Sequence, residues 1–379
     1  MSITRFPSFF YLYMLISQEP LLMLDPFENL SKIQEEEYHN KFKLLKNSLL
    51  REKEIFLGWL NGLSTVNNKI LHEFQKEFHS SFWKFYLLAV FSDSGFQMDF
   101  SKNSSYLLIS SPQQILIEAV VSNIKEVVTA EKDETLEDLL ASLIPPHLSL
   151  DYSEVLDQAI VRHSVAIKKK WTKYIKNYSK LSHLNGEKPF VIALSSYDQI
   201  NHGREFLYPM MALLYGLYYD PMTDDYLPRT SIKKPGSRSD ITLGFFNNAG
   251  MEDIAAILFS CTTTLDKLTS LARSESDSGL NGNIVNILQM SGEPAYRAQF
   301  VSPDNPEQLS DGLFLFHNPF AKNPLERKTF AGTNIIQVYL EGNNFRFEGN
   351  RPPIYSRINT IIKLPEPYMD MVINRLSRR

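Results

Sequence analysis

The chain has 379 residues, of which 43% are hydrophobic and 22% are charged, and its formal net charge is -4 at pH 7. These values exclude wholesale disorder and leave room for two or three domains, or for one large sheet with additions. They also exclude a global positive field, so any binding to nucleic acid needs a local basic patch.

The cysteine content and the N-terminal residues indicate in which cellular compartment the protein is expected. The single cysteine, Cys261, excludes an internal disulfide and a thiolate zinc site, and it is expected to be a small core residue. The apolar run Phe9–Ile16 is shorter than the roughly 20 residues that cross a bilayer, and no small-residue cleavage site follows it. We therefore expect a cytoplasmic protein that has no membrane partner.

Residues 1–67 are expected to form an N-terminal helical region. Between residues 28 and 63, apolar side chains recur at helix-compatible spacing among many Glu and Lys residues. This pattern predicts helices that have a solvated, charged face.

Residues 68–196 are predicted to form an α/β core, in which a helix, three strands, a helix and a strand follow one another. The predicted elements are a helix over 68–91, strands over 96–100, 106–109 and 115–121, a helix over 153–181 and a strand over 190–194. An acidic segment at 131–143 is expected to be an insertion. The third strand is nearly all apolar apart from Glu118, which indicates a strand buried on both faces.

Residues 197–379 are predicted to form a C-terminal α/β extension packed on this core. The predicted elements are helices over 205–219 and 263–272, and strands over 241–246, 254–260, 313–316, 335–340, 345–347 and 354–362. Gly342-Asn343-Asn344 is predicted to be a hairpin turn between two of these strands.

The order of elements over 68–196 and the acid in Ile117-Glu118-Ala119-Val120 carry a resemblance to a known superfamily. This part of the chain resembles the restriction-endonuclease-like proteins, also called PD-(D/E)xK nucleases. The resemblance implies an αβββαβ core and hydrolysis of phosphodiester bonds. In that family, carboxylates hold Mg²⁺ ions that polarise the phosphate, and a lysine orients the attacking water.

Several positions depart from the family's pattern. Val120 stands where the family has lysine, Ser104-Ser105 where it has Pro-Asp, and Trp83-Lys84 where a helical glutamate is expected. The resemblance therefore implies a site that has lost most of its catalytic groups. In that case Glu118 is either a remaining active-site acid or a structural carboxylate bonded to backbone or to a basic helix.

Other residues nearby offer substitutes for the missing groups. If the site is active, its catalytic residues are expected to be Glu118, Asp99, Glu77 and a migrated lysine, which could be Lys168, Lys169 or Lys170 and is taken to be Lys169. Glu118 and Asp99 would then hold Mg²⁺.

A basic stretch marks the predicted helix over 153–181. No Asp or Glu occurs between Gln158 and Gly186. The nucleic-acid-binding candidates share one helical stripe and are Arg162, Lys169, Lys173, Lys176 and Lys180. The interleaved aromatic side chains are expected to face the core rather than stack on bases.

Three functional hypotheses follow. The first is a nucleic-acid-associated recognition or structural subunit whose catalytic site is degraded. The second is an active, divergent, Mg²⁺-dependent nuclease. The third is a protein-interaction component, as a homo-oligomer or with another protein, that has no nucleic-acid role. Bacterial defence is a setting that the resemblance alone implies.

Overall fold

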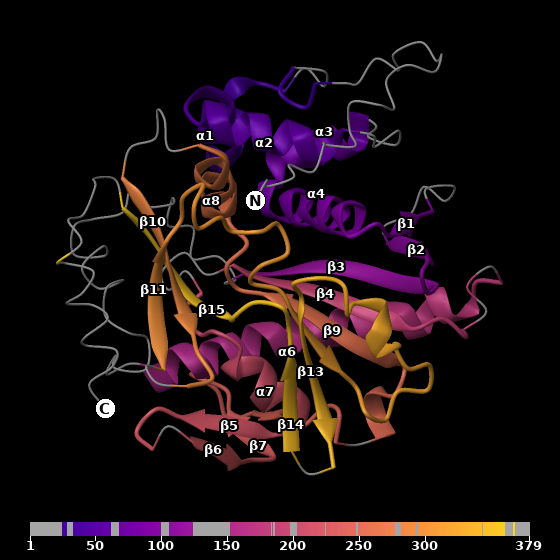
Figure 1. The fold of residues 1–379 in the computed structure, drawn as a ribbon. Helices are drawn as coiled ribbons and strands as arrows, with labels where there is room; N and C mark the ends of the chain where they lie inside the picture. Colours follow the sequence, from indigo (N-terminus) through magenta and orange to yellow (C-terminus); the bar gives the residue numbers. More distant parts are fainter. Residues whose placement is uncertain are drawn as a thin grey trace, which may run out of the picture.

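A computed structural model of the chain describes residues 25–28, 33–61, 68–99, 106–123, 152–182, 184, 186–197, 203–223, 225–247, 249–276, 282–292, 295–342, 344–360 and 367. Figure 1 shows a large mixed sheet that has helices on both faces, so the predicted α/β class is confirmed. The predicted acidic insertion at 131–143 and the apolar run Phe9–Ile16 lie outside the described residues.

The N-terminal helices cover one face of the sheet (Figure 1). In chain order they are η3 (Glu35–Glu37), α1 (Asn40–Asn47), α2 (Leu50–Leu60), α3 (Asn68–Lys76) and α4 (Phe78–Asp93). The single helix predicted over 68–91 is therefore two helices that meet at Glu77. Both halves bury Phe side chains in one aromatic cluster, where Phe56 stacks on Phe74 with ring centroids 4.8 Å apart.

Within the described residues, eight strands form the large sheet in the order β1-β2-β3-β4-β9-β12-β13-β14. Their bounds are β1 (Gln97–Met98), β2 (Leu107–Ser111), β3 (Ile115–Asn123), β4 (Phe190–Tyr197), β9 (Ile254–Ser260), β12 (Phe314–His317), β13 (Ile336–Glu341) and β14 (Asn344–Glu348). Strands β3, β4 and β9 are mutually parallel. The expected boundary between residues 196 and 197 falls inside this sheet, because β4 pairs directly with β9.

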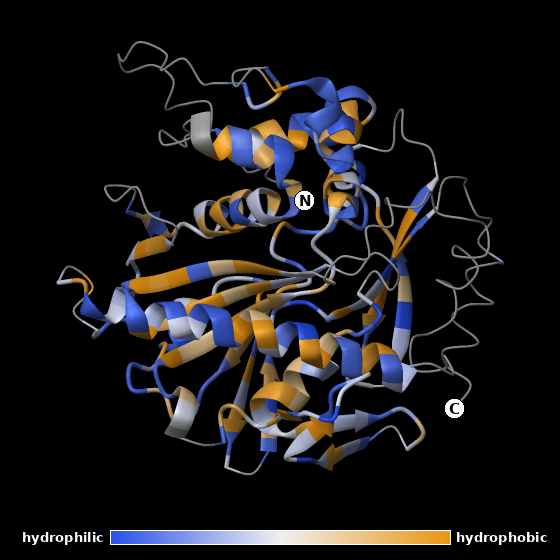
Figure 2. Ribbon diagram, turned by 180° about the vertical axis from the view of Figure 1, so that it is seen from behind, coloured by the Kyte–Doolittle hydropathy of each residue, from blue (hydrophilic) through white to orange (hydrophobic). Residues whose placement is uncertain are grey.

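The other face of the sheet is covered by α6 (Tyr152–Lys176), η5 (Tyr178–Lys180) and α7 (Tyr208–Tyr215). Tyr174 of α6 stacks on Phe190 of β4 with ring centroids 4.2 Å apart, and Tyr178 is buried. The aromatic side of this helix thus faces the core, as predicted. Figure 2 shows apolar residues concentrated on the large sheet, with polar and apolar residues alternating along α6.

The C-terminal half adds smaller elements. They are β5 (Leu217–Asp220), β6 (Asp225–Pro228), β7 (Ser231–Lys233), β8 (Asp240–Thr242), η6 (Ala249–Met251), α8 (Leu265–Glu275), β10 (Asn283–Gln289), β11 (Tyr296–Phe300), η7 (Arg327–Thr329) and β15 (Ile354–Thr360). In the described part of the chain, β11, β10 and β15 form a separate antiparallel sheet of three strands. The helix predicted over 205–219 is shorter than expected, because Gly216 adopts a left-handed conformation and β5 begins directly after it.

Candidate functional site

Glu118 lies in the middle of β3, and its side chain points toward α6. Side chains alternate along a strand, so Ile117 and Ala119 pack on the α4 side while Leu116 packs on the α6 side with Glu118. Glu118 is 0% exposed. A buried carboxylate at this depth is costly unless partners on the helix above neutralise it.

Two lysines of α6 supply that partner charge. Oε1 of Glu118 accepts hydrogen bonds from Nζ of Lys170 at 2.6 Å and from Nζ of Lys173 at 2.9 Å. Residues three apart on a helix lie on the same side of it, so both ammonium groups reach one carboxylate oxygen. Of the two expected interpretations of Glu118, a carboxylate bonded to a basic helix describes these contacts.

The surroundings of this carboxylate shift the pKa values of both lysines. Burial lowers the pKa of Lys170, against the opposing attraction of Glu118, and the nearby charge of Lys84 lowers it further. Burial alone would also lower the pKa of Lys173, but hydrogen bonds to Tyr178 and Glu118 raise it above its ordinary value. Lys84 stands where the resemblance predicts a helical glutamate, so that position now adds positive charge. We call Glu118, Lys170 and Lys173 the lysine–glutamate niche, and its formal net charge is +1.

The residues of the niche do not fit a magnesium site. Oε1 of Glu118 is held by two ammonium groups, which repel a cation. Among the described residues, no group of three or more His, Cys, Asp or Glu side chains could hold a metal ion.

The two expected partner acids lie away from Glu118. Strand β2 separates Asp99, which follows β1, from β3. Two strand spacings and the offset along β3 place the Cα atoms of Asp99 and Glu118 about 12 Å apart. Glu77 is exposed at the start of α4, on the opposite face of the sheet from Glu118.

The predicted nucleic-acid-binding stripe on α6 is split by the structure. Lys169, Lys176 and Lys180 are exposed. Lys173 is turned partly toward Glu118, and its side chain remains 33% exposed. Arg162 points inward instead, where its guanidinium lies 3.9 Å from the buried carboxylate of Glu205. The exposed basic surface is therefore formed by the C-terminal half of α6 and by η5.

A second polar cluster lies at the carboxyl ends of the parallel strands, and the sequence patterns did not indicate it. Nδ1 of His163 lies 2.9 Å from Oγ of Ser122, and the hydroxyl of Ser196 donates to Glu205. Burial and the charge of Arg162 hold the pKa of His163 well below its ordinary value, so the imidazole is neutral. The only sequence signal for this cluster is the presence of serines at the ends of two apolar strands.

A third cluster joins α8 to the three-stranded sheet. Glu307, 3% exposed, accepts hydrogen bonds from Lys267 at 2.5 Å, from Arg357 at 2.5 Å and from Asn286 at 2.7 Å. Although burial raises its pKa, Arg357 and Lys267 lower it to about 2. Its hydrogen-bonding atoms are satisfied by neighbours from several elements, so the cluster is a structural connection rather than a reactive site.

The remaining sequence expectation concerns Cys261, and a further basic side chain, Lys233, ends β7. Cys261 is buried and burial raises the pKa of its thiol well above the ordinary value, which fits a core residue. Lys233 is exposed and pairs with Asp240 at 2.6 Å.

No helix among the described residues has both the length and the apolar character needed to cross a bilayer. Compared with protein-family models, with curated proteins and with solved structures, the chain shows no match. Its α/β architecture and the niche at Glu118 therefore stand on the geometry of this chain alone.

Proposed function

We propose that the chain is a nucleic-acid-associated protein on a restriction-endonuclease-like scaffold whose catalytic site is degraded, so that it serves as a recognition or structural subunit. The observation that carries this proposal is the pairing of Glu118 with Lys170 and Lys173 at 2.6 and 2.9 Å. Two ammonium groups bind the carboxylate that, in the family, holds a metal ion. Such a site binds phosphate by direct charge attraction instead.

The arrangement of elements supports the scaffold part of the proposal. The chain runs α4, β1, β2, β3, α6 and β4, with β1, β2 and β3 antiparallel in sequence and β3 parallel to β4. Helices α4 and α6 cover opposite faces of this part of the sheet. This is the order that the αβββαβ resemblance implies, and Glu118 lies in its third strand.

Charge supports the nucleic-acid part. The niche has a net charge of +1, and Lys169, Lys176 and Lys180 extend this positive surface along the same helix and the turn after it. Each lysine that contacts a phosphate releases counterions, so affinity depends on salt concentration. A local basic surface of this kind is what a chain of negative net charge needs in order to bind nucleic acid.

Fluorescence anisotropy with labelled single-stranded DNA, duplex DNA and RNA tests this proposal. The wild type is expected to bind with an affinity that falls with salt. The triple variant Lys169→Gln, Lys176→Gln, Lys180→Gln is expected to reduce the slope of log affinity against log salt by about 2–3 for duplex DNA. The control is Lys328→Gln, an exposed lysine remote from α6 in the sequence. If neither the affinity nor the slope differs between the triple variant and the control, this surface does not bind nucleic acid and the protein-interaction hypothesis takes precedence.

One observation favours the second candidate, a divergent metal-dependent nuclease. In the described part of the structure, Oε2 of Glu118 is buried and accepts no hydrogen bond. A carboxylate oxygen in that state has capacity for one more ligand. Cleavage of labelled DNA or RNA that requires Mg²⁺ or Mn²⁺ and disappears in Glu118→Ala would support this candidate over the first.

A further inference from the structure

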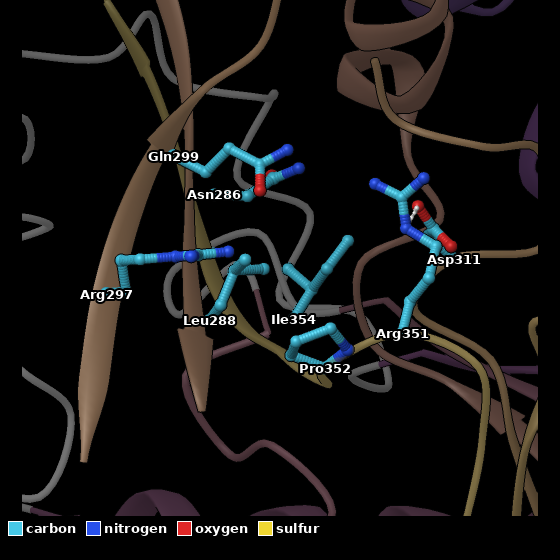
Figure 3. Close-up of a pocket in the computed structure, with 8 residues that line it drawn as sticks. All are labelled: Asn286, Leu288, Arg297, Gln299, Asp311, Arg351, Pro352 and Ile354. Carbon is cyan, nitrogen blue, oxygen red and sulfur yellow. Dashed lines mark ion pairs between the residues drawn. The ribbon is translucent and has the colours of Figure 1, made fainter. Parts of the chain in front are cut away.

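A small pocket lies on the three-stranded sheet, away from the niche at Glu118. Its volume is about 210 Å³, and residues of β10, β11, β15 and the segments before β12 and β15 line it. Figure 3 shows Arg297, Gln299 and Asn286 on one side of the opening, and Arg351 with Asp311 on the other. Pockets for drug-sized ligands measure roughly 300–1,000 Å³, so this one suits a small group.

The two arginines of the pocket differ in their partners. Arg351 is held in place by two contacts. Its Nε lies 3.1 Å from Oδ2 of Asp311, and its Nη2 donates to the carbonyl oxygen of Pro306 at 2.8 Å. Arg297 is exposed, and within the described residues its guanidinium has neither an ion pair nor a hydrogen bond. Its five N–H groups are therefore available to a ligand.

The charge around the pocket is positive. Arg351 and Asp311 balance each other, whereas Lys267 and Arg357 together face one carboxylate, that of Glu307, directly behind Asn286. With Arg297 added, the formal charge of these groups is +2. This excess favours an anion. The amide nitrogen of Gln299 donates to the carbonyl oxygen of Asn305 at 3.4 Å, and its second N–H is a further neutral donor on the same wall.

We propose that this pocket binds a phosphate group, carried by a small phosphorylated molecule or by the 5′ end of a nucleic acid. Donors reach the opening from opposite walls, which suits the tetrahedral oxygens of phosphate better than the planar pair of a carboxylate. The guanidinium of Arg297 is the main anchor, because planar guanidinium groups bind phosphate through two parallel hydrogen bonds. The apolar side chains of Leu288 and Ile354 leave room for a small organic portion next to the phosphate.

Isothermal titration calorimetry at low ionic strength tests the proposal with four probes: inorganic phosphate, ribose 5-phosphate, a 5′-phosphorylated trinucleotide and the same trinucleotide with a 5′ hydroxyl. Wild-type protein is expected to bind at least one phosphate-bearing probe saturably. Arg297→Gln is expected to weaken that binding at least tenfold, and Arg297→Lys less, because lysine keeps the charge without the fork geometry. Arg238→Gln, at an exposed loop position, is the control and should bind as the wild type does.

The pattern of binding identifies the source of the phosphate. Preference for the phosphorylated trinucleotide over its hydroxyl counterpart, lost in Arg297→Gln, assigns the pocket to a nucleic-acid end. Binding of the two small phosphates alone assigns it to a small molecule. The proposal is overturned if no probe binds saturably, or if Arg297→Gln binds as well as the wild type. The lysines of α6 are unchanged in these variants, so failure here is distinguishable from failure of the proposed nucleic-acid surface.

Discussion

Removing the two lysines of the niche is expected to destabilise the protein more than neutralising Glu118. Glu118 is fully buried and cannot reach water. The side chains of Lys170 and Lys173 are 18% and 33% exposed, so each can turn its ammonium group outward when the carboxylate is lost. The larger loss of stability is therefore expected for the lysine variant, which leaves the buried charge of Glu118 unpaired.

The magnitudes follow from the same contacts. The double variant Lys170→Met, Lys173→Met leaves a buried carboxylate without a cation at Oε1, which should cost about 3–5 kcal/mol in the free energy of unfolding. Glu118→Gln keeps an acceptor of the same shape and should cost about 1–2 kcal/mol. The triple variant that adds Glu118→Leu to the double change should recover most of the loss, because an apolar group then fills an apolar site.

Urea denaturation at pH 7, monitored by tryptophan fluorescence and by circular dichroism, measures these differences. Coincident transitions from the two probes are needed before free energies are compared. Two results would refute the reasoning: Glu118→Gln less stable than the double lysine variant, or a triple variant no more stable than that double variant.

Three further predictions concern His163, Glu307 and Gly203. The pKa of His163 is lowered on folding, so the unfolded state takes up the proton first and stability is lost as pH falls below about 6.5. In His163→Gln, the stability lost between pH 6.5 and pH 5, measured by urea denaturation, should shrink by about 2 kcal/mol. An unchanged loss would show that this imidazole is not buried in its neutral form. The pKa of Glu307 is lowered to about 2, so its contribution is present above its ordinary value of 4.5 and is lost as pH falls toward 2. Glu307→Gln leaves Lys267 and Arg357 without a carboxylate and should cost about 3–5 kcal/mol at pH 7, whereas a loss below 1 kcal/mol would contradict a structural role for the cluster. Gly203 has φ of +83° and a Cβ there would lie 2.5 Å from the carbonyl oxygen of Cys261, so Gly203→Ala should lower the melting temperature by several degrees, unlike Gly250→Ala, where nothing lies within 4 Å.

Much of the fold was predictable from local patterns. The apolar runs that became β3, β4, β9 and β12 are short and bounded by turn residues, and their length and boundaries indicate buried strands rather than helices. Strands β10 and β11 were not predicted, because β10 mixes Asn and Gln with its apolar residues. Its polar side chains are accommodated by distant partners, such as Glu307 and Arg357, that no local pattern reveals.

The candidate site was predictable only in part. Glu118 stood out because it is an acid within an apolar strand, and a lysine on the following helix was the expected partner. Which lysine depends on the rotation of the helix, since each residue turns the side chain by about 100°. Of the three candidate lysines, Lys169 was chosen but is exposed, whereas Lys170 contacts the carboxylate together with Lys173. Arg162 was placed on the outer stripe because the periodicity of α6 contains no information about Glu205 beneath it.

The proposed function requires that the ammonium groups of Lys170 and Lys173 stand at Glu118 in place of a metal ion. Thermal denaturation of purified wild-type protein with and without 5 mM Mg²⁺ or Mn²⁺, paired with a cleavage assay on labelled DNA and RNA, tests it most directly. We expect no cation-dependent rise in melting temperature beyond that of Glu118→Gln, and intact nucleic acid. A rise that is specific to the wild type, together with cleavage that Glu118→Gln abolishes, would contradict the claim.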